Sequence, residues 1–254
     1  MAGHNKWSKV KHKKAAADSK RSKVWTKIIR EITVAARMGG SEPNSNPRLR
    51  KAIDDARSAN MPKDNIQRAI AKGEGGEGQN LEEITYEGYA PGGVGLIVEC
   101  MTDNKNRTLG DVRSLIQKRG GSLGAAGSVL FGFHKKGQMF FAKDSNKLIN
   151  EDRLLEIGLE QGLEELSEED DGFYLTCSME HYLNLKQAFI DANMEPSNSE
   201  LTMVPDNYIK VSKEQAQKII NMIDVLEDLD DVQNVYTNID LDSLDEEELE
   251  SLMR

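Results

Sequence analysis

The sequence predicts an α+β multidomain protein, in which a basic domain of three helices precedes two α/β sandwiches, one inserted in the other. Three observations lead to this prediction. Apolar residues recur with helical spacing through residues 1–72, whereas short apolar runs alternate with helix-like segments beyond residue 80. A glycine-rich linker separates the two parts. The sign of the charge also changes at this linker.

Three short helices are expected in the N-terminal domain, over residues 19–38, 47–60 and 62–73. Residues 1–18 precede them as an arm, because they are rich in lysine and too poor in apolar residues to bury a core. Gly39-Gly40 supplies a left-handed stop for the first helix. Asn46 and Pro47 are typical of the N-cap and first position of the second helix. One apolar stripe on each helix is enough for a bundle with a helix-turn-helix character.

Strands and helices alternate after the linker. The expected strands cover residues 85–90, 94–101, 128–133, 138–141, 173–177, 201–204 and 232–236. The expected helices cover residues 106–119, 152–161, 181–192 and 213–226. This order favours two ferredoxin-like sandwiches, with the second inserted in the first. Pro91-Gly92-Gly93 is either a tight hairpin turn or a place where the backbone approaches a partner closely.

These elements predict the domain limits. A basic helical domain covers residues 1–72, a linker residues 73–80, the first sandwich residues 81–134 and 206–240, the inserted sandwich residues 135–205, and an acidic tail residues 241–254. The tail is expected to fray or to form a short helix.

Charge is segregated along the chain. Residues 1–72 hold 18 Lys and Arg against 6 Asp and Glu, a net charge of +12, whereas residues 73–254 hold 15 against 37, a net charge of −22. Such a segregation points to nucleic acid or to a membrane surface as the partner.

Composition also bears on the compartment. Cys100 and Cys177 lie in apolar runs and do not make a disulfide framework, which indicates a reducing compartment. No run approaches 18 apolar residues, so no membrane contact is expected. The basic N-terminus lacks the apolar segment of a secretory signal. We therefore expect a cytoplasmic protein.

No catalytic, cofactor or metal site is expected. Gly73–Gly78 matches the dinucleotide-binding pattern G-x-G-x-x-G, but it neither follows a strand nor opens a helix, and its glutamates would repel a pyrophosphate. His4, His12, His134 and His181 have no partner at metal-ligand spacing. The acidic runs are typical of solvated surface rather than of one carboxyl group isolated in an apolar pocket. We therefore expect a protein that is not an enzyme.

The first helix carries its charges on one side. The basic residues are spaced by 3, 4, 3 and 7 positions, which keeps them in one stripe: Lys20, Lys23, Lys27, Arg30 and Arg37. The opposite side is apolar and carries Trp25, Ile28, Ile29, Ile32 and Ala36. A cationic outer face of this kind binds polyanions. The alternative is a face that is basic for solubility alone, but such faces usually mix both signs.

The arm supplies the other main contacts. Its lysines neutralise phosphates, and Trp7 offers either a face for base stacking or an apolar plug for the bundle. Little sequence recognition is expected, because lysine carries no base code. Lys105 and Arg107 either contact phosphates at a helix N-terminus or act as turn and cap residues. The expected nucleic-acid contacts are Lys6, Trp7, Lys9, Lys11, His12, Lys13, Lys14, Lys20, Arg21, Lys23, Lys27, Arg30, Arg37, Lys105 and Arg107.

Four stretches of the chain match one known pattern. They read AGHNKWSKVKHKKAAADSKRSKVWTKIIREI at residues 2–32, MPKDNIQRAIAKG at 61–73, YEGYAPGGVGLIVECMTDNKNRT at 86–108 and GSV-F at 127–131. In these stretches the chain resembles the YebC family, which includes the mitochondrial translational activator of cytochrome c oxidase. The resemblance runs through nearly the whole chain in order. It implies a bacterial cytoplasmic member with three domains, one α+β domain inserted in the other, and no catalytic site.

The resemblance implies one of two functions. The commoner description of the family is a DNA-binding transcriptional regulator, and the other is a translation factor that helps ribosomes stalled at sequences such as proline runs. A body of net charge −22 is repelled by a long duplex, which argues against DNA as the partner. The sequence also offers no obvious dimer element for paired half-sites, so we expect a monomer. Ribosomal RNA recognised by shape suits one basic domain on an acidic body. A third alternative is a protein–protein adaptor whose acidic domains bind a basic partner.

Overall fold

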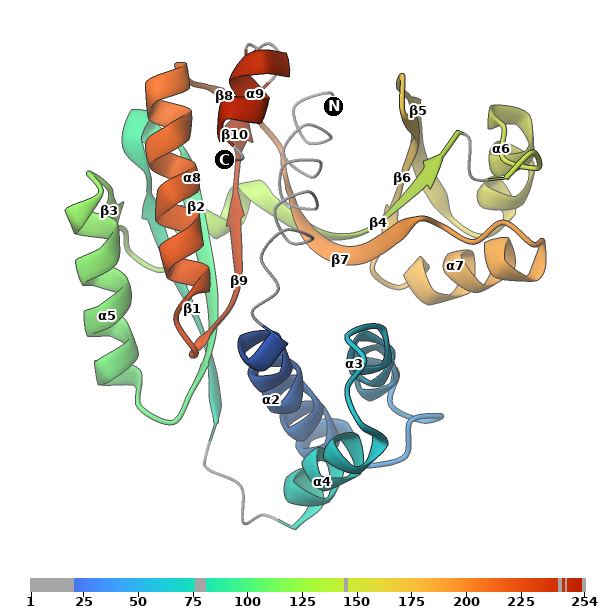
Figure 1. Ribbon diagram of the computed structural model, residues 1–254, viewed down its shortest axis with the longest axis horizontal. Helices are drawn as coiled ribbons and strands as arrows, with labels where there is room; N and C mark the ends of the chain where they lie inside the picture. The colour runs from blue at the N-terminus through green and yellow to red at the C-terminus, as the bar shows by residue number, and fades with distance from the viewer. Residues whose placement is uncertain (1–20, 76–80, 144–145, 242–243, 245, 253–254) are drawn as a thin grey trace. The chain divides into compact units, whose positions relative to one another are not determined.

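The computed structural model describes residues 21–75, 81–143, 146–241, 244 and 246–252 (Figure 1). Its helices are α2 (Arg21–Gly39), α3 (Pro47–Ser58), α4 (Lys63–Glu74), α5 (Lys105–Lys118), α6 (Glu151–Glu160), α7 (Tyr182–Asp191), α8 (Lys213–Glu227) and α9 (Glu246–Leu252). Its strands are β1 (Glu82–Tyr89), β2 (Gly95–Thr102), β3 (Ser122–Leu123), β4 (Phe133–Ala142), β5 (Leu163–Glu168), β6 (Gly172–Ser178), β7 (Asn198–Pro205), β8 (Ile209–Lys210), β9 (Val232–Thr237) and β10 (Ile239–Asp240). Short 3-10 turns lie at η1 (Pro91–Gly93) and η2 (Leu130–Gly132). The predicted α+β class, with helices first and then two four-stranded sheets and the short parallel pair β8-β10, is confirmed.

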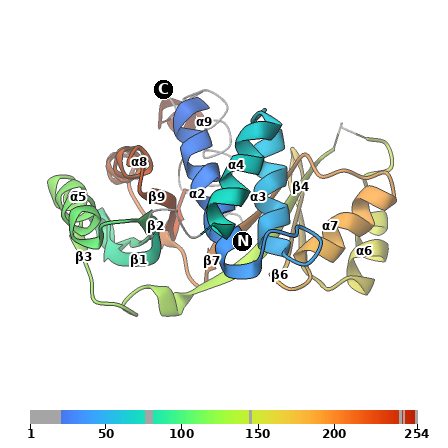
Figure 2. The same cartoon turned by 90° about the horizontal axis from the view of Figure 1, so that it is seen from below.

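Helices α2, α3 and α4 lie side by side as a bundle (Figure 2). Their shared core contains the predicted apolar side of α2, with Ile32 and Ala36 buried and Trp25, Ile28 and Ile29 packed against it. The predicted cap of α3 is also confirmed. The Asn46 side chain accepts a hydrogen bond from the Leu49 N–H at 3.0 Å and donates to the Ala35 carbonyl at 2.8 Å. One residue therefore starts α3 and holds it against the end of α2.

Gly73 sets the distance between α4 and α2. A Cβ at this position would lie 2.5 Å from the Thr33 carbonyl oxygen and 2.9 Å from the Ala36 Cβ, both on α2. We expect Gly73→Ala to lower the free energy of unfolding by about 1–3 kcal/mol, because two backbones must move apart. Gly110→Ala is the matched control, since no atom lies within 4 Å of a Cβ there, and it should stabilise α5 by about 0.5–1 kcal/mol. Urea titrations measure both, and unchanged stability of Gly73→Ala would contradict this account of the bundle.

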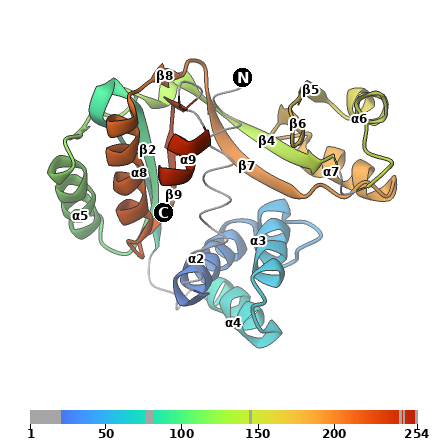
Figure 3. The same ribbon diagram turned by 45° about the horizontal axis from the view of Figure 1, so that its top comes forward.

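The first sheet is antiparallel, with strand order β3-β1-β2-β9. Helices α5 and α8 lie beside each other along it (Figure 3). The hairpin between β1 and β2 closes through η1, where Gly92 and Gly93 have φ angles of 82° and 80°. The Ala90 N–H donates to the Val94 carbonyl across this turn at 2.8 Å. The tight-turn interpretation of these glycines is therefore confirmed, because such φ angles suit glycine and few other residues.

Two strand predictions differ from the structure. Residues 128–133 were expected to form a strand, but they form a loop and η2, and the strand is the short β3 before them. The reason is that several amides of this loop donate to the Glu87 carboxylate rather than to a neighbouring strand. Strand β5 was not expected, because its acids resemble a solvated run. It is an edge strand paired only with β6, so its acidic side chains can still reach water.

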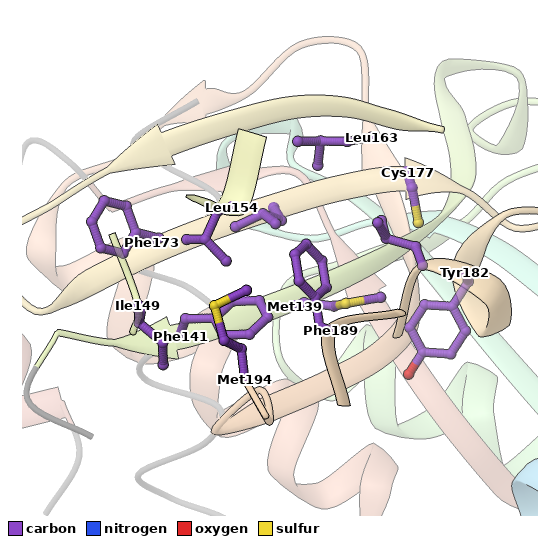
Figure 4. Packing of buried hydrophobic residues seen from close by; sticks show 12 residues of the cluster. Met139, Phe141, Ile149, Leu154, Leu163, Phe173, Cys177, Tyr182, Phe189 and Met194 are labelled. Atoms are coloured by element: carbon purple, nitrogen blue, oxygen red, sulfur yellow. The ribbon is translucent and has the colours of Figure 1, made fainter. Parts of the chain in front are cut away.

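The second sheet is antiparallel, with strand order β5-β6-β4-β7. Elements β4-α6-β5-β6-α7-β7 follow one another in the ferredoxin-like order, and the unexpected β5 completes the predicted ferredoxin-like class. Figure 4 shows the core between this sheet and its helices, where Phe141 and Phe189 meet edge to face with centroids 5.0 Å apart. Cys177 lies in this core, and burial raises the pKa of its thiol to about 11. Cys100 is likewise free and buried, with a pKa raised by burial to about 12, so both thiols are structural.

The bundle and the first sheet belong to one compact unit, and Phe131–Lys210 forms most of a second unit. The predicted domain limits stay a prediction. A short helix, α9, lies in the predicted acidic tail. Among the helices of the described chain, none is long and apolar enough to cross a membrane.

Candidate nucleic-acid interface

The predicted contacts divide between two parts of the chain. Eight of them lie outside the described residues: Lys6, Trp7, Lys9, Lys11, His12, Lys13, Lys14 and Lys20. Arg21 begins α2, but its side chain is not among those described. Lys23, Lys27, Arg30 and Arg37 lie on α2, and Lys105 and Arg107 begin α5. The geometry of the interface therefore rests on these last six residues.

Lys23 and Lys27 contact the C-terminal end of α8. The Lys23 ammonium lies 2.8 Å from Asp228 Oδ1 and donates to the Asp228 carbonyl at 3.1 Å. The Lys27 ammonium donates to the Glu227 carbonyl at 2.9 Å. The last carbonyls of a helix lack partners within it and carry partial negative charge, so cations stabilise them. Because α8 has no basic residue in its own last turn, α2 supplies these cations.

Arg30 extends this contact into the loop between α8 and β9. Its guanidinium lies 2.9 Å from Asp231 Oδ1 and also donates to the carbonyls of Asp230 and Met101. The other carboxylate oxygen, Asp231 Oδ2, lies 2.7 Å from Arg107 Nη2. One carboxylate thus binds two arginines from two different helices.

Two hydroxyl groups complete this arrangement. The Thr108 and Thr102 hydroxyls lie 2.7 Å and 3.1 Å from Asp231 Oδ2. We term these residues the Asp231 cluster: Asp231, Arg30, Arg107, Thr102 and Thr108. Burial alone would raise the pKa of Asp231, but hydrogen bonds from Arg107 and Thr108 and the charge of Arg30 outweigh it, so this pKa lies below its ordinary value. The same hydrogen bond from Arg107 to Asp231 raises the pKa of the guanidinium.

Helix α2 is therefore covered on two sides. Besides the bundle core, Val34 packs with Leu81 and Met101 at the end of the first sheet. Arg37 donates to the Leu81 carbonyl at 2.6 Å. The basic stripe is only in part an outer face: Lys27 and Arg30 are half-buried against the end of α8 and the loop after it, whereas the Lys23 side chain is 37% exposed and Arg37 is exposed. Lys105 is paired with Glu82.

As contacts with nucleic acid, these six residues stay a prediction, and each of them already has a partner within the chain. Asp231 was not singled out from the sequence. The sequence does show an acidic run from Asp224 to Asp231, which is opposite in charge to the basic stripe. Nothing local in the sequence indicates that the two segments meet.

Glu87 organises a second feature of the same unit, the loop of residues 124–130. Its buried carboxylate accepts hydrogen bonds from the N–H groups of Gly127, Val129 and Leu130 at 2.6, 2.7 and 2.7 Å. Burial alone would raise the pKa of Glu87, but these three donors outweigh it and lower the pKa. The arrangement fixes the loop backbone rather than preparing a proton transfer. Within the described residues, no group of three or more His, Cys, Asp or Glu is placed to hold a metal ion.

Comparisons with known proteins agree with this architecture. A family model described as "TACO1/YebC protein N-terminal domain" matches residues 5–76, and one described as "TACO1/YebC second and third domain" matches residues 81–239. The chain belongs to the TACO1/YebC family. The matched residues of the YebC N-terminal domain include α2, α3 and α4, and those of the second and third YebC domains include both sheets.

Curated relatives are similar to this chain over nearly their whole length. A probable transcriptional regulatory protein of Geotalea uraniireducens is 48% identical over 254 residues, which is 100% of both chains. One of Syntrophobacter fumaroxidans is 50% identical over 243 residues, covering 95% of this chain and 96% of the relative. A crystal structure of the conserved hypothetical protein Aq1575 from Aquifex aeolicus is similar, with a TM-score of 0.77 and 41% identity over 88% of this chain and 91% of the other.

Proposed function

We propose that the protein is a non-enzymatic regulator of gene expression that binds DNA through its basic arm. The observation that carries this proposal is the charge of the first 30 residues, which hold ten Lys and Arg against one acid, Asp18, in a chain of net charge −10. The name of its relatives, probable transcriptional regulatory protein, supports it. The proposed contacts are Lys6, Trp7, Lys9, Lys11, His12, Lys13, Lys14 and Lys20.

The arm is favoured over α2 because the described cations of α2 already have partners. Lys23 and Lys27 bind the end of α8, and Arg30 binds Asp231. A phosphate must displace these partners before it can bind there, and the exchange gains little free energy when one anion replaces another. Arm lysines that bind phosphates would release counterions from DNA, which makes the affinity strongly dependent on salt.

Replacing Lys9, Lys11, Lys13 and Lys14 with glutamine tests the arm. We expect the affinity for a 30-base-pair duplex to fall by about 30-fold or more at 100 mM salt, and the slope of log K against log salt to decrease by about 4. Fluorescence anisotropy over a salt series measures both. The matched control replaces four exposed lysines outside the arm, Lys118, Lys135, Lys147 and Lys210. Equal losses in the two variants would leave only a general effect of net charge, and no loss in either would contradict the proposed arm.

A second candidate function is a translation factor that binds ribosomal RNA. It is favoured by the net charge of −22 on residues 73–254, which a long duplex repels. Co-sedimentation with ribosomes at physiological salt separates the candidates. Ribosome binding that needs the arm, together with weak duplex binding, would replace the DNA proposal with the translation one. Ribosome binding that survives loss of the arm lysines would instead indicate a protein–protein adaptor.

A further inference from the structure

We propose that the exposed face of α4, which carries Lys63, Arg68 and Lys72, is a second surface that binds the phosphate backbone of duplex DNA. This inference rests on the proposed function and adds to it a described surface that lies outside the arm. The three residues are exposed. They were not among the contacts expected from the sequence.

The pairing of the other described cations in the bundle favours α4, with one exception: Arg50 of α3 donates only to the Pro43 and Asn44 carbonyls. The cations of α2 bind the end of α8, the Asp231 cluster and the first sheet. On α3, Arg48 is held by Glu31 and Glu83, and its pKa is raised chiefly by the hydrogen bond to Glu31. Lys51 and Arg57 of α3 pair with acids of their own helix, Asp55 and Asp54. The α3 surface therefore mixes both signs, as an ordinary solvated face does.

Helix α4 also carries two exposed acids, Asp64 in its first turn and Glu74 at its end, and Glu74 accepts a hydrogen bond from the Ser41 hydroxyl. Among the described residues, however, no carboxylate pairs with Lys63, Arg68 or Lys72. The Arg68 guanidinium donates only to the Asp64 carbonyl and the Asn65 side chain of its own helix. These cations can therefore bind phosphate without breaking an ion pair, unlike those of α2.

The helix presents these cations outward because its other face is fixed. Ile66 and Ala69 are buried in the bundle core, and Gly73 lies against the α2 backbone. At 3.6 residues per turn, Arg68 and Lys72 lie about 40° apart on the half of the helix away from this core, whereas Lys63 lies at the other edge of that half, about 180° around the axis from Lys72.

The position of α4 in the bundle supports the same partner. It is the second helix of the α3–turn–α4 pair, and the turn between them is short, with Asn60 at a φ of 54°. In helix-turn-helix proteins the second helix enters the major groove. Charge complementarity then favours a duplex whose phosphates line both edges of the groove. Gln67, exposed between the cations, is the side chain of this face that can hydrogen-bond to a base edge.

The test compares two charge reversals in the full-length protein. Arg68→Glu with Lys72→Glu changes α4, and Arg113→Glu with Lys118→Glu changes the exposed face of α5 by the same charge. The probe is a 30-base-pair duplex of random sequence, with an RNA hairpin of similar charge beside it. We expect the α4 variant to bind the duplex about 10-fold or more weakly at 100 mM salt, with the salt slope reduced by about 2. The α5 variant should change the affinity less than about 3-fold, since it makes no proposed contact.

The outcomes separate this inference from the function on which it rests. If the wild type does not bind the duplex, the proposed function fails and the α4 surface fails with it. If the wild type binds and the α4 variant binds equally well, or no worse than the α5 variant, only the α4 inference is overturned. A loss confined to the RNA hairpin also overturns it, because the occupant is then RNA. Arg68→Gln with Lys72→Gln, together with thermal unfolding of each variant, excludes misfolding as the cause of a loss.

Discussion

Replacing Asp231 with alanine is expected to lower the free energy of unfolding by about 2–3 kcal/mol, because a partly buried ion pair with Arg30 is broken and the buried hydroxyls of Thr102 and Thr108 lose an acceptor. The Asp231 and Arg30 side chains are only 12% and 19% exposed, so water replaces the lost contacts poorly. Urea titration measures the change. The adjacent Asp230→Ala is the matched control: Asp230 is exposed and binds Arg30 through its carbonyl, which the substitution keeps.

Asp230→Ala should change the free energy of unfolding by less than about 0.5 kcal/mol. If Asp231→Ala lies equally close to the wild type, the two arginines do not depend on this carboxylate and the Asp231 cluster is not what holds α2 to the first sheet. Proteolysis within α2 gives an independent readout, since a released helix is cut faster.

Replacing Glu87 with alanine is expected to have the second large effect, about 2–4 kcal/mol, because three backbone donors lose one buried acceptor. The effect should be local as well as global. Hydrogen exchange at Gly127, Val129 and Leu130 should accelerate far more than exchange in β2. Glu87→Gln is the conservative control, since it keeps the shape and one carbonyl oxygen and should lose less stability. Unchanged exchange at these three amides in Glu87→Ala would show that the loop is held by other contacts.

The two carboxylates also give stability a defined dependence on acid. The pKa values of Asp231 and Glu87 are lower in the folded protein than in the unfolded chain. Their contribution is complete above the unfolded values of about 4, and it is lost as the pH falls through the lowered values. The difference between the wild type and Asp231→Asn should therefore be full near neutral pH and shrink below about pH 4.

Local signals predicted the helices of the bundle well. The Asn46 cap and the Gly39-Gly40 stop form between residues that are close in the chain, so they can be predicted from the local sequence. Residues 128–133 were expected to form a strand, but backbone donors in this part of the chain are taken by Glu87, about 40 residues earlier. No apolar pattern within the loop reports such a distant acceptor.

The basic stripe shows the same limit for the candidate site. Its period placed Lys23, Lys27 and Arg30 on one side of α2 correctly, but periodicity does not say what that side meets. In the structure that side of α2 meets the acidic C-terminal end of α8 and the loop after it. The α4 face was missed for the opposite reason, since Lys63, Arg68 and Lys72 look ordinary until the pairing of most other cations in the bundle is known.

The contact between α2 and the end of α8 has a consequence for synthesis of the chain. Lys23 and Asp228 are 205 positions apart, and Arg30 and Asp231 are 201 apart. At about 5–20 residues per second, α2 leaves the translating ribosome roughly 10–40 s before the residues that hold it in the folded protein. During that interval Lys23 and Lys27 lack the acceptors that later hold them, and Arg30 lacks Asp231, because these acceptors lie at the end of α8 and in the loop after it.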